Sequence, residues 1–123
     1  MNDLNFFHPG QVWQYYTRSG EENSTLTILK IDELEDDAII HIRIDDIKLA
    51  YTDDIIHLPF SAEAMESSVT GFVKHLDVIA EFTEGYQQWR EVFDNGKGGY
   101  WKMPVSEVLD AINAMLNERS SGK

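Results

Sequence analysis

The sequence predicts an α+β fold, in which an N-terminal antiparallel meander of three to four strands is packed by two to three C-terminal helices. Two patterns carry this prediction. In residues 38–49, Ile40, Ile42 and Ile44 alternate with polar residues, which is the side-chain period of a strand with one buried face. After residue 60 the apolar residues recur with the period of an amphipathic helix. Because the strands precede the helices, we expect helices on one face of the sheet.

The length and the composition favour one globular domain. Hydrophobic residues make up 42% of the 123 residues, which is enough for a core without covalent cross-links. We divide this single domain, 1–123, into a strand-rich part (9–60), a helix-rich part (61–118) and a flexible tail (119–123). The chain has no cysteine, which excludes disulfides, thiolate metal sites and a cysteine nucleophile. The N-terminal residues lack a signal-peptide pattern and no apolar run could span a bilayer, so we expect a cytoplasmic protein.

Four strands are expected in the first half of the chain, at residues 11–18, 25–31, 38–49 and 55–58. In the second strand the apolar positions change face after Ile28, which indicates a β-bulge or a strand covered on both sides. In the third strand the alternation slips at Asp45-Asp46, which indicates another bulge. Pro59 is expected to end the fourth strand, because proline cannot donate to the hydrogen-bond ladder.

Three helices are expected in the second half, at residues 61–76, at 84–94 and from Pro104 onwards. Ser61 suits the N-cap of the first helix, and Gly71 inside it would allow a close approach to the sheet. The second helix presents Tyr86, Trp89 and Phe93 on one side.

The net charge of −12 restricts the class of partner. Nucleic acids and anionic membranes are bound through lysine and arginine, so we expect neither as a partner. Residues 21–54 hold eleven acidic and three basic residues, and a basic protein partner fits this half of the molecule. The alternative is that these charges only keep the surface solvated. The candidate partner-binding residues are four of these acidic residues together with two aromatic residues of the kind enriched at interfaces. They are Glu21, Glu22, Asp36, Asp37, Tyr100 and Trp101.

A polar row on the third strand is the candidate ligand site. His41, Arg43 and Asp45 point to one face of this strand, and His57 lies on the next strand. These four side chains are candidate ligand-binding residues, for a small molecule or a metal ion. The alternative is a solvated row of cross-strand hydrogen bonds and ion pairs, which is the normal outer face of an antiparallel sheet. No metal-ligand spacing such as H-E-x-x-H occurs, so no metal or cofactor is assigned.

The sequence contains no recognisable catalytic motif. The segment N-G-K-G-G at 95–99 lacks the first glycine and the hydroxyl residue of a phosphate-binding loop, and turn formation explains it better. No nucleophile elbow occurs, and adjacent aspartates in turns point apart. We therefore assign no catalytic residue and favour a protein that is not an enzyme.

Five segments, spread along most of the chain, carry a resemblance to a protein family. They are V-W-Q-Y-Y-T-R-S-G-E-E-N-S-T-L-T-I-L-K-I at 12–31, H-I-R-I-D at 41–45, H-L-P-F-S at 57–61, E-G-Y-Q-Q-W at 84–89 and F-D-N-G-K-G at 93–98. Together they resemble a family of short bacterial single-domain proteins to which no activity is attached. The resemblance implies a bacterial, cytoplasmic protein of one domain and supplies no ligand or site residue.

Three functional hypotheses follow, in decreasing order of preference. The first is a small acidic cytoplasmic protein that binds, or acts as an antagonist of, a basic protein partner. The second is a small-ligand or metal-binding module, with which an enzymatic activity is compatible, that uses the polar sheet face. The third is an architectural subunit, a homodimer that buries Tyr100 and Trp101.

Overall fold

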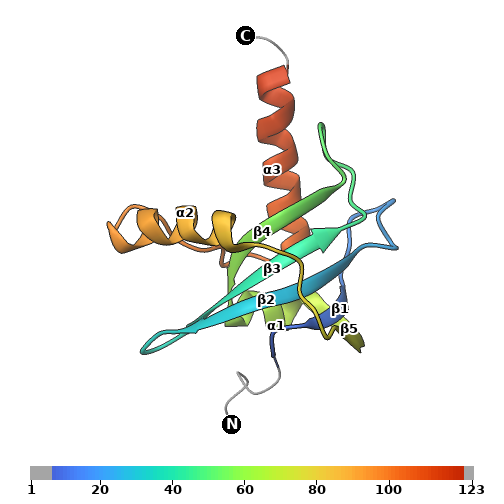
Figure 1. Cartoon of the computed structure of the whole chain (residues 1–123). Helices are drawn as coiled ribbons and strands as arrows, with labels where there is room; N and C mark the ends of the chain where they lie inside the picture. The colour runs from blue at the N-terminus through green and yellow to red at the C-terminus, as the bar shows by residue number, and fades with distance from the viewer. Residues whose placement is uncertain (1–6, 121–123) are drawn as a thin grey trace.

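The chain forms a five-stranded antiparallel sheet with helices on both faces, in a computed structural model that describes residues 7–120 (Figure 1). In chain order the elements are β1 (Gln11–Tyr15), β2 (Thr25–Glu33), β3 (Ala38–Asp45), β4 (Asp54–Ser61), α1 (Ala62–Ser68), β5 (Val69–His75), α2 (Thr83–Asp94) and α3 (Val105–Ser120). The predicted α+β class is confirmed, with most of the helical residues in the C-terminal half.

The strand order is β4-β3-β2-β1-β5, and all neighbouring strands are antiparallel. The first four strands form the expected meander. After α1 the chain returns to the far side of the sheet, where β5 pairs with β1. The sheet therefore has one strand more than the three to four that were predicted, and β4 and β5 are its edges.

The prediction of one helix over 61–76 is wrong in its second half. Ser61 does cap α1, because its side chain accepts a hydrogen bond from a backbone N–H of the first turn at 3.1 Å. The helix ends at Ser68, and Val69–His75 continues as β5, so Gly71 lies in a strand. Two physical reasons favour the strand: its valine, threonine and phenylalanine suit a pleated surface, and β1 offers an open edge of backbone donors and acceptors.

Three other predicted boundaries are corrected by the structure. β1 ends at Tyr15 instead of residue 18. β3 ends at Asp45 instead of residue 49, because Asp46 takes a left-handed backbone conformation with φ of 62°. α3 includes residues 119 and 120 of the predicted tail, and 121–123 lie outside the described residues.

Pro59 lies inside β4 and does not end it. β4 is an edge strand, and the Pro59 carbonyl accepts a hydrogen bond from the Trp101 N–H at 3.0 Å on its outer side. An N–H of residue 59 would point the same way, so its absence takes nothing from the β3–β4 ladder. On the same edge, the Ser61 N–H donates to the Trp101 carbonyl at 2.8 Å.

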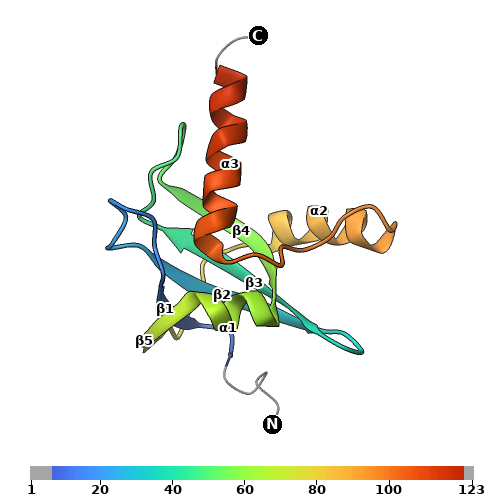
Figure 2. The same cartoon turned by 180° about the vertical axis from the view of Figure 1, so that it is seen from behind.

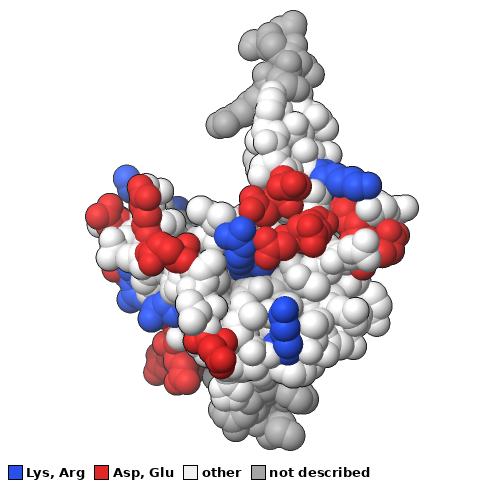
Figure 3. Space-filling view, turned by 45° about the vertical axis from the view of Figure 1, so that its right-hand side comes forward, with Lys and Arg blue, Asp and Glu red and all other residues white. Residues whose placement is uncertain are grey.

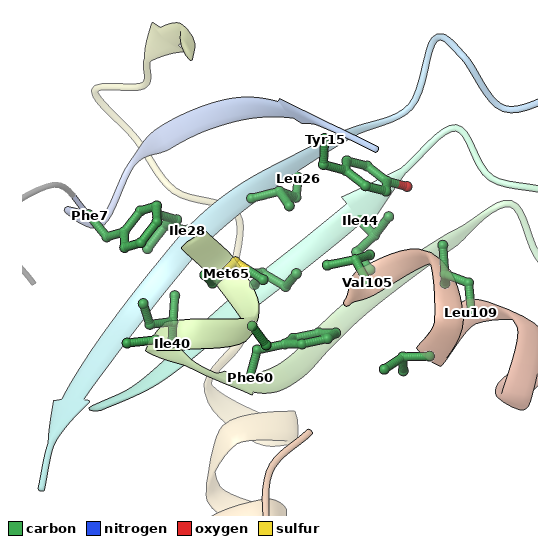
Figure 4. Packing of buried hydrophobic residues seen from close by; sticks show 14 of the residues in the cluster. Phe7, Tyr15, Leu26, Ile28, Ile40, Ile44, Phe60, Met65, Val105 and Leu109 are labelled. Carbon is green, nitrogen blue, oxygen red and sulfur yellow. The ribbon is translucent and has the colours of Figure 1, made fainter. Parts of the chain in front are cut away.

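The isoleucine face of β3 carries the core, as the alternation predicts. Ile40, Ile42 and Ile44 are each 0% exposed. In Figure 4 the residues that pack around this face come from β2, β4 and both helices α1 and α3, and include Leu26, Ile28, Phe60, Met65, Val105 and Leu109.

The expectation that all helices lie on one face is wrong. α1 and α3 cover the isoleucine face, whereas α2 lies on the opposite face of the sheet (Figures 1 and 2). There the ring centroids of Trp89 in α2 and His41 in β3 are 4.8 Å apart. Within the described part of the chain, no helix has the length and apolar character needed to cross a membrane.

Candidate functional site

His41 lies at the centre of a hydrogen-bonded chain of three side chains, in which His41 is buried and the other two residues are half-buried. His41 is 0% exposed. Its Nδ1 is 2.9 Å from Nε2 of His57 on β4, and its Nε2 is 2.9 Å from Oδ2 of Asp32 on β2. We call Asp32, His41 and His57 the histidine chain. The expectation of a solvated polar face is therefore wrong at His41.

The carboxylate of Asp32 sets the position of each proton when both rings are neutral. It accepts, so the Nε2–H of His41 donates to it and Nδ1 of His41 is left as an acceptor. The Nε2–H of His57 then donates to that acceptor. Both ring nitrogens of His41 are thus engaged within the protein, and Nδ1 of His57, which has no hydrogen-bond partner among residues 7–120, ends the chain.

A β-bulge in β2 brings Asp32 to the side of the sheet that His41 occupies. The register between β2 and β3 shifts between Ile28 and Lys30, so Leu29 is an extra residue. The shift confirms the predicted bulge, and because of it Ile31 pairs with Ile40 and packs on the isoleucine face, as Ile28 does. Without it, Asp32 would point to the isoleucine face, so the sequence pattern already contained a signal for the carboxylate partner of His41.

A second bulge lies in β4, not at Asp45-Asp46 where it was predicted. The register between β3 and β4 shifts opposite Arg43, where two β4 residues, Ile56 and His57, stand against one residue of β3. A bulge bends a strand and re-aims a side chain. Here it accompanies the approach of His57 to the ring of His41.

α2 covers the histidine chain with residues that sequence reasoning did not assign to the site. The Tyr86 hydroxyl donates to Oδ2 of Asp32 at 2.9 Å, and Nη1 of Arg90 lies 3.5 Å from the same oxygen. Trp89 packs edge-on against the ring of His41, with an interplanar angle of 76°. The aromatic side predicted for this helix indicated that the helix packs against another part of the protein, but it did not indicate that this part is His41 and its partners.

Burial keeps both histidines neutral at neutral pH. It lowers the pKa of His41 to about 4, against the opposing effect of the hydrogen bond to Asp32. Proximity to His57 and Lys30 adds to the lowering. Burial also lowers the pKa of His57, and it raises the pKa of Tyr86, so the tyrosine hydroxyl keeps the proton that it donates.

The four predicted ligand-binding residues divide into two pairs. His41 and His57 belong to the histidine chain. Arg43 instead forms ion pairs with Asp45 at 2.9 Å and with Asp54 at 2.8 Å. Among residues 7–120, no group of three or more histidine, aspartate or glutamate side chains is arranged to hold a metal ion.

An aromatic depression lies next to the histidine chain, on the outer edge of β4. It is open and shallow, has a volume of about 370 Å³, and is lined by Pro59, Trp89, Gly99, Tyr100 and Trp101. Trp89 is both a wall of this depression and the cover of the buried histidine, and its indole N–H donates to the Gly99 carbonyl at 2.8 Å. The predicted partner-binding residues Tyr100 and Trp101 are thus brought together in one concave surface.

The acidic turn between β2 and β3 lies beside this depression. The Tyr100 hydroxyl donates to Oδ2 of Asp37 at 3.2 Å. Asp37 is half-buried, whereas Asp36 is exposed. Four of the six predicted partner-binding residues, Asp36, Asp37, Tyr100 and Trp101, therefore lie in one region of the surface.

The other two predicted partner-binding residues lie elsewhere, because the β1–β2 loop and the β2–β3 turn are at opposite ends of β2. Glu21 is only 3% exposed, and its carboxylate is held by the Arg18 guanidinium and by the Lys48 N–H at 2.7 Å. Glu22 is exposed. Both border a polar hollow of about 520 Å³. In Figure 3 the acidic side chains form separate groups with lysine and arginine side chains among them.

Comparisons with protein-family models, with curated proteins and with solved structures found no match to this chain.

Proposed function

We propose that this protein is a binding protein that receives a basic segment of a partner protein in the aromatic depression. The observation that carries the proposal is the hydrogen bond from Tyr100 to Asp37, which joins the acidic β2–β3 turn to a surface walled by three aromatic rings. Aromatic anchors beside opposite charge are the features that dominate binding energy at protein interfaces.

The chemistry of the depression favours a lysine or arginine side chain as the inserted group. A cation placed over an aromatic ring is attracted by the negative face of the ring. The chain's own Lys102 has this arrangement, with its ammonium 5.3 Å from the centroid of the Tyr100 ring. Glu33, Glu35 and Asp36 are exposed on the neighbouring turn and add a long-range attraction for a positively charged chain.

The shape of the depression favours a segment of another protein over an enclosed metabolite. Sites for small molecules usually bury most of the ligand surface, whereas this one is open and shallow. The exposed surface on the side of the β2–β3 turn provides room for a partner segment that extends beyond the aromatic rings. A basic protein that binds here would have its own cationic surface covered, which is how an acidic antagonist acts.

The test is a titration of fluorescein-labelled hexa-arginine and hexa-lysine peptides, followed by fluorescence anisotropy at low ionic strength. We expect binding that weakens as salt is added. Trp101→Ala should weaken it about tenfold, because it removes an aromatic wall. Asp36→Asn should weaken it about twofold to fivefold, as expected for one exposed charge pair.

The matched control is Glu22→Gln, which removes one exposed negative charge at the other end of β2. It should leave peptide affinity nearly unchanged. Equal losses from Asp36→Asn and Glu22→Gln would show that only the net charge acts, and would contradict a defined docking surface. Binding that does not respond to Trp101→Ala would also contradict it.

The histidine chain favours a second candidate, a small-ligand site at the free Nδ1 of His57. This nitrogen has no hydrogen-bond partner among the described residues, and the chain to Asp32 orients the ring. A donor group of a small molecule is the complementary chemistry. A proton–nitrogen NMR screen of metabolite mixtures, read at the His57 ring, tests it, and unchanged ring signals would exclude it.

A further inference from the structure

The two edge strands of the sheet differ in whether another segment of the chain is hydrogen-bonded to their outer side. On the outer side of β4, the segment around Trp101 forms backbone hydrogen bonds with Pro59 and Ser61. β5 is the other edge, and among residues 7–120 it pairs only with β1. An unpaired strand edge is a ready template for another strand, and native proteins usually cover or charge it.

β5 also exposes apolar side chains that an isolated edge strand would be expected to avoid. Phe72 is 54% exposed and Val73 is 44% exposed. The Phe72 ring packs against Trp13 of β1 in an edge-type arrangement, with ring centroids 5.5 Å apart, and more than half of the residue stays exposed. Exposed apolar groups along an open backbone ladder are the surface that strand pairing buries.

We propose that two copies of this chain pair antiparallel through β5 and join their sheets into one. Phe72 is the middle residue of Val69–His75, so a two-fold axis at Phe72 pairs every residue of the strand with one residue of the second copy. In this register Phe72 faces Phe72 of the partner copy, and Val73 faces Gly71. Lys74 then faces Thr70, so no like charges stand opposite each other.

The distribution of charge favours a second copy as the occupant. A chain with a net charge of −12 repels another copy over most of its surface. β5 is the exception, because its seven residues include one lysine, one histidine and no aspartate or glutamate. Among residues 7–120, the edge strand that no other segment covers is therefore one without a negative side chain, and repulsion between two copies is weaker there than at the acidic turns. This surface lies at the opposite edge from the aromatic depression, so the inference is independent of the proposed function.

The experiment uses opposite charges at one exposed position, Thr70. The dissociation constant is measured by sedimentation equilibrium for the wild type, Thr70→Glu and Thr70→Lys. The proposed register puts residue 70 opposite Lys74 twice in the dimer, so Thr70→Glu should tighten it and Thr70→Lys should weaken it, each about tenfold. Net charge alone predicts the reverse order, because the lysine variant is the less acidic one.

A charge exchange completes the test. The double variant Thr70→Lys with Lys74→Glu restores opposite charges across the two-fold axis, and it should dimerise at least as well as the wild type. Both positions are exposed, so circular dichroism should report an unchanged fold for every variant. A wild-type chain that stays monomeric up to millimolar concentration overturns the proposal, as does a dimer whose affinity ignores Thr70 or changes in the reverse order.

Discussion

Lowering the pH from 6.5 to about 4 should destabilise the fold through His41. The pKa of this buried histidine is about 4 in the folded protein and 6.5 for an ordinary histidine. Above pH 6.5 the ring is neutral in both states, and its full contribution to stability is present. Between the two values the unfolded chain binds a proton that the folded chain does not, so the free energy of unfolding falls as the pH falls. The difference corresponds to about 3 kcal/mol.

The variant His41→Gln isolates this effect from the many carboxylates. A glutamine amide group can donate to Asp32 and its carbonyl can accept from His57, but it does not titrate. Urea unfolding of both proteins across the pH range gives two stability curves. Their difference removes the shared contribution of other groups. We expect the wild type to lose about 3 kcal/mol more than the variant between pH 6.5 and about 4.

Two results would refute this reasoning. Parallel stability curves for the wild type and His41→Gln would show that the ring does not titrate in the predicted window. A proton NMR titration of the ring that gives a normal or raised pKa would show that the Asp32 carboxylate outweighs burial. A normal pKa would mean that the ring makes no pH-dependent contribution to stability, and only a raised pKa would reverse the sign of the pH dependence.

Three further predictions concern the local structure, and each is tested by urea unfolding. Gly10→Ala should cost about 1–3 kcal/mol, because residue 10 has φ of 96° and a Cβ there would stand 2.9 Å from a backbone carbonyl; Gly20→Ala, with φ of 88° and no such contact, should cost less. Glu21→Gln should cost about 2–4 kcal/mol, because it leaves a guanidinium without its buried carboxylate, while Glu22→Gln should leave the stability nearly unchanged. Ser61→Ala should cost about 1 kcal/mol by removing the cap of α1, and a neutral result would contradict the cap.

Local patterns predicted the parts of the fold that local forces decide. The alternation of Ile40, Ile42 and Ile44 shows which side of β3 packs in the core, because successive side chains of a strand point to opposite faces of the sheet. The break in the alternation after Ile28 indicated the bulge for the same reason. These signals need no knowledge of what lies elsewhere in the chain.

The fifth strand could not be predicted in this way. Val69, Phe72, Val73 and Leu76 recur at helical spacing, and the same residues also suit a strand. What decides between the two is the open edge of β1, which lies more than fifty residues earlier in the sequence and offers backbone partners. Tertiary pairing therefore overrides a local period that is compatible with both structures.

In the candidate site, too, the sequence predicts what depends on local structure and does not predict what depends on distant parts of the chain. The period of the strand placed His41 and Arg43 on one face, which is correct. Their different environments come from α2, which covers His41 and leaves Arg43 among carboxylates at the open end of the sheet. No local pattern in β3 indicates where α2 lies, so the hydrogen-bonded chain that this helix covers was expected to be a solvated row.

α2 contributes to both the histidine chain's cover and the aromatic depression. None of its residues is fully buried, so the helix has no deep apolar anchor. Its contacts with the sheet include Trp89 against His41 and the hydrogen bond from Tyr86 to Asp32. Because Trp89 is at the same time a wall of the aromatic depression, the depression and the cover of the histidine chain share one side chain. A proton on His41 would turn its Nδ1 into a donor that faces the donating Nε2–H of His57, so the histidine chain would have to rearrange beneath Trp89 while the core on the other face keeps its contacts.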